Sequence, residues 1–172
     1  MKSSYKEEDV TLLLKDITGM VVPQPTEERE RLIQSGRHYS EMLPQEYRPT
    51  AAYLELYEMA LEKYADITAQ AVAAVSEKAY AAHAGRLVLV SLARAGTPIG
   101  ILMRRYLQKR YGADVPHYSI SIIRGRGIDK NAMRHLLAHR AAEELQFVDG
   151  WTGKGAIAHE LAAALQGFPG VS

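Results

Sequence analysis

Cysteine is absent from this chain of 172 residues. Without a thiol, these residues hold no disulfide bond, no thiolate metal ligand and no cysteine nucleophile. The charge is also nearly balanced, because 21 lysines and arginines face 20 aspartates and glutamates and leave a formal net charge of +1. A charge this small gives no general electrostatic reason to bind nucleic acid.

Long hydrophobic runs are missing as well. No segment has the length that a membrane span needs, and the charged N-terminus does not resemble a secretory signal. These absences predict a cytoplasmic protein that does not contact a membrane. The chain is still long enough to fold around a sizeable hydrophobic core.

The stretch from Leu145 to Ala156 carries the most informative motif. An apolar run at 145–148 predicts a buried strand, and an alanine-rich pattern at 156–165 predicts a helix. A glycine loop between a strand and a helix N-terminus can hold a phosphate, because loop N–H groups and the helix dipole favour an anion. We therefore predict that the loop residues bind substrate: Gly150, Trp151, Thr152, Gly153, Lys154 and Gly155.

Two other interpretations of this loop remain open. A Walker A loop is weakly supported, because Val148 stands where that motif needs its first glycine and Gly155 where it needs serine or threonine. The loop could also be an ordinary tight turn. Asp149, directly after the strand, suits ribose hydroxyls or a Mg²⁺ ion better than a phosphate.

A second unit of the same kind begins at residue 86. The run 86–92 predicts a central, doubly buried strand, and residues 99–111 predict a helix with Thr97 as its N-cap. The intervening loop is small enough for close backbone approach, and Arg94 supplies a charge. Two such loops suggest a ligand with two anionic ends. The residues of this second loop predicted to bind it are Ala93, Arg94, Ala95, Gly96 and Thr97.

A third strand is predicted at 115–123, followed by a basic, glycine-rich segment at 124–130 and a helix at 131–142. Arg124 and Arg126 lie where a mobile lid could close over an anionic substrate. An exposed turn and a weak RNA contact are the alternatives. His135 and His139 share a helical face, but two histidines without a third ligand do not predict a metal site.

The spacing of apolar residues in the first half of the chain predicts helices at 6–17, 26–36 and 50–83. A stripe along the last of these predicts core packing: Leu54, Tyr57, Leu61, Tyr64 and Thr68, continued by Ala71, Val72 and Val75. The polar, aromatic segment 35–44 is either a surface connection or a loop that reaches a site through His38, Tyr39 and Glu41. The predicted organisation is an N-terminal helical region at 1–84 and an α/β core at 85–172, folded as one unit.

Several of these stretches together resemble a known fold. Residues 90–98, 117–123 and 147–155 resemble the type I phosphoribosyltransferases, which implies an α/β fold with a Rossmann-like parallel sheet and an N-terminal helical extension. With residues 38–44, they resemble more closely a bacterial family associated with tellurite-resistance and stress gene clusters. Some of its members carry the label StiP cysteine protease.

The resemblance implies a function and roles for particular residues. The chain would be a phosphoribosyltransferase-like enzyme of nucleotide metabolism or stress resistance, which binds phosphoribosyl pyrophosphate or a related ribosyl phosphate. The loop 93–96 would contact pyrophosphate, and Asp149 would hold the ribose, directly or through Mg²⁺. The implied catalytic residues are Asp149, Arg94 and Arg126, and the acceptor pocket would be bordered by His38, Tyr39 and Glu41.

Three departures from the family pattern accompany this expectation. Gly150 stands where phosphoribosyltransferases usually have a second acidic residue, which favours the alternative of a non-catalytic nucleotide- or RNA-binding module. Family members are longer, which implies that this chain is a truncated protein, a fragment or a short member. Its expected partners are a second copy of itself or a missing C-terminal region. The absence of cysteine means that a thiol protease mechanism cannot operate within these residues, so the protease label is not expected to apply to this chain.

Overall fold

The computed structural model describes residues 3–151 and 153–171. The chain forms two compact units: the first comprises Met1–Leu14 and Asp66–Ser172, and the second comprises Lys15–Ala65. The boundary predicted between residues 84 and 85 therefore lies inside the first unit, which takes in both the beginning of the chain and the end of a long helix.

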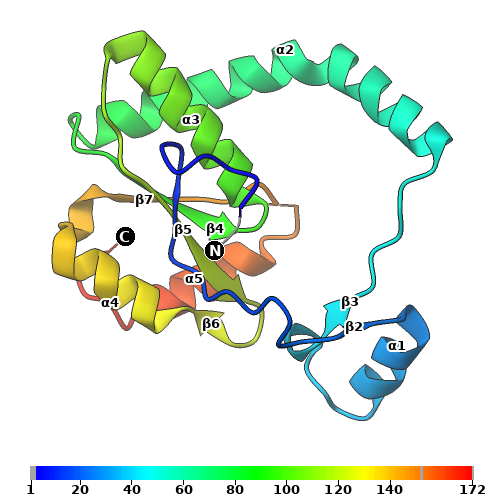
Figure 1. Cartoon of the computed structure of the whole chain (residues 1–172). Helices are drawn as coiled ribbons and strands as arrows, with labels where there is room; N and C mark the ends of the chain where they lie inside the picture. The colour runs from blue at the N-terminus through cyan, green and yellow to red at the C-terminus, as the bar shows by residue number, and fades with distance from the viewer. Residues whose placement is uncertain (1–2, 152, 172) are drawn as a thin grey trace. The chain divides into compact units, whose positions relative to one another are not determined.

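A parallel sheet forms the centre of the first unit (Figure 1). Its strand order is β1-β5-β4-β7, and every neighbouring pair in that order is parallel. A short strand β6 adds an antiparallel pair to β5. The bounds are β1 (Thr11–Leu12), β4 (Val88–Ala93), β5 (His117–Ile123), β6 (Gly127–Ile128) and β7 (Leu145–Val148). The three strands predicted from sequence are confirmed, and the fold is mixed α/β.

The central position of β4 follows from its sequence. Its first five residues are buried, as expected of a strand covered by helices on both faces. Val90 is paired with Tyr118 of β5 on one side and with Phe147 of β7 on the other. In the sheet order β7 comes last, next to β4.

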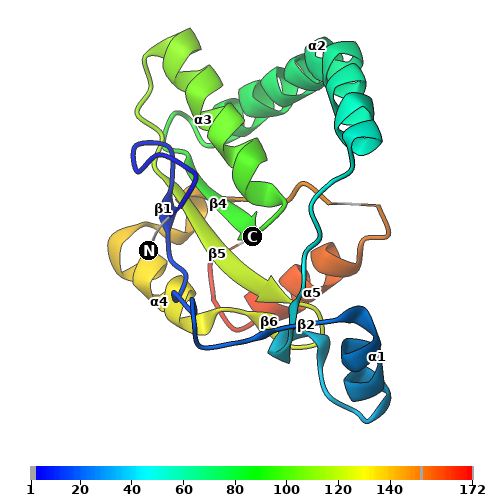
Figure 2. The same ribbon diagram turned by 45° about the vertical axis from the view of Figure 1, so that its right-hand side comes forward.

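Helices cover the two faces of this sheet (Figure 2). The end of α2 (Ala51–Ala82) and α3 (Gly96–Tyr111) pack on one face around Leu89, Met103 and Leu107. On the other face, α4 (Lys130–His139) and α5 (Ala156–Leu165) pack around a cluster that includes Val90 and Ile120. The helix predicted at 156–165 is confirmed at both ends.

Two predicted helix boundaries are wrong. α3 begins at Gly96 with Ala95 as its N-cap, rather than after Thr97. The Thr97 side chain is buried, and its hydroxyl lies 2.8 Å from the Ser119 hydroxyl of β5, so it joins the helix to the sheet. α4 ends at His139, three residues early, and a short 3₁₀ turn follows at Ala142–Glu144.

The helix predicted at 6–17 does not form. A turn instead leads into β1, where Thr11 and Leu12 pair with Tyr118 and Ser119 of β5. The apolar spacing in this segment fits a helix, but pairing with the edge of a sheet overrides local propensity. Asp9 and Val10 become buried as a result.

The second unit holds β2 (Pro23–Gln24), α1 (Thr26–Gln34), a 3₁₀ turn (Tyr39–Glu41), β3 (Leu43–Pro44) and the first part of α2. β2 and β3 pair in parallel. The short charged helix predicted near residue 26 is confirmed.

The core stripe predicted along α2 is wrong for its first part, whereas Val72 in its later part is buried as predicted. Tyr57 is 56% exposed and Tyr64 is 51% exposed, and Leu54 and Leu61 are similar. Helical spacing shows that one face is apolar, but it does not show what covers that face. The residues that α2 buries come from its last part: Val72, Ser76 and Ala79. Within the described ranges, no helix combines the length and the apolar character that crossing a membrane requires.

Candidate functional site

The two glycine loops predicted to bind one ligand are in backbone contact with each other. A Cβ atom on Gly96 would lie 2.1 Å from the carbonyl oxygen of Val148, at the end of β7. A Cβ atom on Gly150 would lie 2.4 Å from the carbonyl oxygen of Ala95. These glycines are therefore needed where the loop after β4 packs against the loop after β7. The predicted close backbone approach exists, and its partner is the neighbouring loop.

Asp149 lies at the carboxyl end of β7, as predicted, and is half-buried. One carboxylate oxygen accepts a hydrogen bond from the backbone N–H of Trp151 at 3.2 Å. The Trp151 side chain is 80% exposed, and Gly153 and Lys154 are also exposed. Thr152, predicted to bind substrate, lies outside the described residues. Gly155 has a φ of 70° and forms the N-cap of α5 without a side-chain hydrogen bond.

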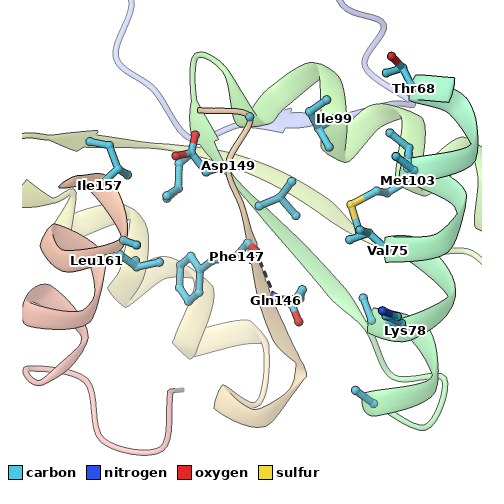
Figure 3. Close-up of a pocket in the computed structure, with 18 residues that line it drawn as sticks. Thr68, Val75, Lys78, Ile99, Met103, Gln146, Phe147, Asp149, Ile157 and Leu161 are labelled. Atoms are coloured by element: carbon cyan, nitrogen blue, oxygen red, sulfur yellow. Dashed lines mark hydrogen bonds between the residues drawn. The ribbon is translucent and has the colours of Figure 1, made fainter. Parts of the chain in front are cut away.

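A groove with a cavity of about 810 Å³ lies beside β7, and Asp149 lines it (Figure 3). One wall is the last part of α2, including Val75; α3 contributes Met103, and α5 contributes Leu161. Most of the lining is apolar. The polar side chains that line it are Thr68, Lys78, Gln146 and Asp149, so Asp149 is its one acidic residue among those described.

The basic residues predicted as catalytic or as a lid are placed separately. Arg94 is exposed in the loop after β4. Arg124 and Arg126 are exposed at the turn of the β5–β6 hairpin, which is closed by pairing of Ile123 with Gly127. The backbone N–H of Gly125 donates to the Glu160 carboxylate of α5 at 2.8 Å. This segment is thus an ordered hairpin tied to α5, and its role as a lid stays a prediction.

The predicted acceptor-pocket residues lie in the second unit. Ser40 donates its backbone N–H to the His38 ring, and the His38 and Tyr39 rings are 4.6 Å apart. Arg37 lies 3.5 Å from the Glu41 carboxylate. These contacts are local, and a substrate contact by His38, Tyr39 or Glu41 stays a prediction.

The structure also assembles a buried polar array that the sequence interpretation missed. The Ser91 hydroxyl of β4 lies 2.7 Å from Nε2 of His117 on β5, and Nδ1 of the same ring lies 2.8 Å from the carbonyl oxygen of Asp9. Because a carbonyl oxygen only accepts, Nδ1 carries a proton. Gly100 completes the array: a Cβ there would lie 2.3 Å from the Ser91 hydroxyl.

One signal in the sequence could have revealed this array. Ser91 interrupts an aliphatic run that was expected to be buried on both faces, and a buried hydroxyl needs a hydrogen-bond partner. The partner is 26 positions away in sequence, and only the strand register places it opposite.

The Asp9 side chain extends the array to the surface. Both of its carboxylate oxygens accept hydrogen bonds from the Arg105 guanidinium, at 2.8 and 2.6 Å. This hydrogen-bonded pairing lowers the pKa of Asp9 against the opposing effect of its burial. The pair anchors the N-terminal segment to α3.

The Ser91–His117 pair has the spacing of a nucleophile and its general base, but it cannot attack a substrate. The Ser91 side chain is 0% exposed, and its hydroxyl also lies 3.0 Å from the carbonyl oxygen of Gly96. A nucleophile must reach the reacting atom. The array therefore holds β4, β5, α3 and the N-terminal segment together.

Burial of His117 predicts a dependence of stability on pH. Burial lowers its pKa below the ordinary value of 6.5, although the hydrogen bond to Asp9 opposes this. Below pH 6.5 the unfolded chain then binds a proton that the folded chain refuses, so the free energy of unfolding falls as the pH drops. We expect a slope of up to about 1.4 kcal/mol per pH unit from this group between pH 6.5 and its folded pKa.

Urea denaturation from pH 7.5 to pH 5 measures this slope. His117→Gln should flatten it, because glutamine stays neutral, while His135→Gln, at an exposed position, should leave it unchanged. Equal slopes in the wild type and in His117→Gln would contradict the assignment.

No group of three or more histidines, aspartates or glutamates that could hold a metal ion occurs among the described residues. The ring centroids of His135 and His139 are 4.6 Å apart with the rings tilted by 40°, and Nδ1 of His139 lies 2.8 Å from the carbonyl oxygen of His135. Mg²⁺ at Asp149 stays a prediction.

Comparison with known proteins places the chain among its relatives. A family model described as "Tellurite-like stress resistance cysteine protease StiP" matches residues 3–172. The chain is 45% identical over 163 residues to a protein of Acinetobacter baylyi named "Cysteine protease StiP". This alignment covers 94% of the chain and 42% of the relative, so the chain spans less than half of that protein's length. No solved structure matches.

These findings correct the function expected from sequence. The family and the relative are described as cysteine proteases, so the predicted phosphoribosyltransferase function and the expected binding of phosphoribosyl pyrophosphate are wrong. The alternative of a non-catalytic nucleotide- or RNA-binding module is set aside on the same finding. The association with stress resistance agrees with the family description. The error arose because a strand, glycine loop and helix are shared by folds with unrelated chemistry.

Proposed function

The chain belongs to the StiP family, and from this premise we propose that it forms the scaffold of a stress-resistance cysteine protease whose thiol comes from polypeptide outside these residues. The scaffold is the edge of the sheet where β4 and β7 end, together with the two loops that pack there. In this proposal the chain positions the reacting groups and does not supply the nucleophile.

The observation that carries this proposal is the complete absence of cysteine from a chain of this family. A cysteine protease attacks its substrate with a thiolate, and a chain without cysteine cannot supply one. Ser91 pairs with a histidine, but it is fully buried. The StiP relative has more than half of its length outside the match, which leaves ample polypeptide to carry a thiol.

Asp149 is the residue of this chain that we propose as part of the active centre. It is half-buried at the carboxyl end of β7, where ligand-binding groups gather in open α/β sheets. In thiol and serine proteases a histidine takes the proton of the nucleophile, and a third polar group orients that histidine. The Asp149 carboxylate can accept a hydrogen bond from such a ring N–H and would then be a positioning residue.

The exposed loop residues are proposed to meet the substrate. Trp151 and Lys154 are exposed beside Asp149 in sequence, and Arg94 is exposed in the facing loop. Gly96 and Gly150, by contrast, serve the contact between the loops. Their predicted role in binding substrate is replaced by a structural one in this proposal.

The finer fold class is also part of the proposal. A sheet of the type I phosphoribosyltransferase kind is supported by the parallel order β5-β4-β7 and by the glycine loop between β7 and α5. Such a fold would not imply transferase chemistry, because a fold can carry unrelated active sites.

The test compares this chain with a chimera in which the chain replaces the matching part of the Acinetobacter relative. Hydrolysis of a fluorescent casein substrate is measured for both, before and after treatment with iodoacetamide, which alkylates thiols. The chain alone, which cannot be alkylated at cysteine, serves as the matched control for effects of the reagent on other groups.

A further inference from the structure

β7 has an open edge within the part of the chain that the structure describes. In the strand order it comes last, and its paired neighbour is β4. An open strand edge presents backbone N–H and C=O groups that can pair with another strand. β7 is also short and largely apolar, so charged side chains do not protect it.

One backbone carbonyl of β7 is bound by a side chain. The carbonyl oxygen of Phe147 accepts a hydrogen bond from the side-chain amide of Gln146 at 3.1 Å (Figure 3). The donor is the side chain of its sequence neighbour and not the backbone of another strand. This is a replaceable partner, because the glutamine amide could turn to solvent.

Apolar surfaces flank this edge on both faces of the sheet. On one side lie Val75 of α2 and Met103 of α3, and on the other lie Ile157 and Leu161 of α5. A second cavity of about 540 Å³ continues along the same strand and shares Gln146, Phe147, Ala158 and Leu161 with the first. A strand placed here would be covered on both faces, which is how inner strands of parallel sheets are buried.

The topology indicates the direction of such a strand. β5 connects to β7 through α4, and this connection passes over β4. α5 follows β7 and packs on the same face of the sheet as α4, in the same apolar cluster. A parallel strand after α5, on the far side of β7, would repeat that connection with the same hand, as parallel crossovers in one sheet almost always do.

We propose that the open edge of β7 binds a further parallel strand, supplied by StiP-type polypeptide outside these residues. The occupant follows from the length of the relative, of which the chain covers 42%. The strand is apolar and rich in β-branched residues on both faces, because both walls of the groove are apolar. The proposal concerns assembly and does not depend on the catalytic role proposed above.

Hydrogen exchange tests this docking without any substrate. The β7 backbone amides are compared between this chain and the chimera with the Acinetobacter relative described above. We expect the β7 amides that do not pair with β4 to exchange about 100-fold more slowly in the chimera, because a new strand pairs with them. Equal exchange in the two proteins would overturn the proposal.

A pair of matched variants shows whether the groove carries the effect. Val75→Glu puts a carboxylate into the groove at a position where the residue is 55% exposed. Leu102→Glu puts a carboxylate on α3 outside the groove lining, at a residue that is 45% exposed. In the chimera, Val75→Glu should restore the fast exchange of the chain alone, and Leu102→Glu should not. Equal effects of the two variants would overturn the proposal.

Sedimentation of the chain alone tests whether a second copy of this chain occupies the edge instead. A monomer with unprotected β7 amides agrees with the proposal. A dimer whose β7 amides are protected, and lose protection in Val75→Glu, would overturn it in favour of a second copy of this chain. Because none of these readouts involves hydrolysis, an inactive chimera with a protected β7 would refute the proposed protease function and leave the docking intact.

Discussion

Replacing Gly96 by alanine is expected to cost about 3 kcal/mol or more of the free energy of unfolding. The new Cβ atom would lie 2.1 Å from the carbonyl oxygen of Val148 and 3.0 Å from its carbonyl carbon. These are backbone atoms at the end of β7, so no side chain can rotate away to make room. The loop after β4 would have to separate from the loop after β7.

Gly153→Ala is the matched control for this change. A Cβ atom there meets nothing within 4 Å, so we expect its effect to stay within about 0.5 kcal/mol. Urea denaturation followed by circular dichroism measures both variants. Equal midpoints for Gly96→Ala and Gly153→Ala would show that the two loops are not in the contact described here.

Replacing Asp149 by asparagine in the chimera is expected to lower kcat/KM by about 100-fold. The side chain keeps its shape and keeps an oxygen that can accept the hydrogen bond from the Trp151 N–H, so the loop should stay folded. What is lost is the negative charge that would orient a histidine and stabilise its protonated form. The pH profile should change as well, because loss of a nearby carboxylate lowers the pKa of that histidine.

Asp114→Asn is the control for this experiment. Asp114 is an 88% exposed carboxylate paired at 3.0 Å with the largely buried Arg104, and solvent screening keeps the contribution of so exposed a carboxylate small. Its kcat/KM should match the parent chimera. An Asp149→Asn chimera with unchanged kcat/KM and an unchanged pH profile would remove Asp149 from the active centre.

Much of the fold could be predicted from sequence. The apolar runs that became β4, β5 and β7 are strong local signals, and the pattern at 156–165 located α5. Parallel pairing also followed, because β4 is an aliphatic run interrupted only by Ser91. The segment at 6–17 could not be predicted, since its pairing with Tyr118 and Ser119 depends on a strand more than 100 residues away.

The position of the site could be predicted from sequence, but the contacts made by its residues could not. Sequence placed Asp149 and the two glycine loops at the carboxyl ends of strands, and the structure has them there. It could not show that Gly96 and Gly150 each pack against the backbone of the other loop, because this contact forms only when β4 and β7 are neighbours. The Ser91–His117 contact escaped for the same reason.

The exposed face of α2 shows a further limit. Tyr57 and Tyr64 have the spacing of a core stripe, yet both are about half exposed. Periodicity identifies an apolar face, and only the surrounding structure decides whether it is buried. The apolar groove along β7 is the corresponding case in the first unit, where the walls are present and the strand between them is proposed to come from elsewhere in a StiP-type protein.

The most direct test of the account is casein hydrolysis by the chain alone and by the chimera, each with and without iodoacetamide. We predict no hydrolysis by the chain alone, because it contains no cysteine, and hydrolysis by the chimera that alkylation abolishes. Hydrolysis by the chain alone, or hydrolysis by the chimera that survives complete alkylation, would contradict it.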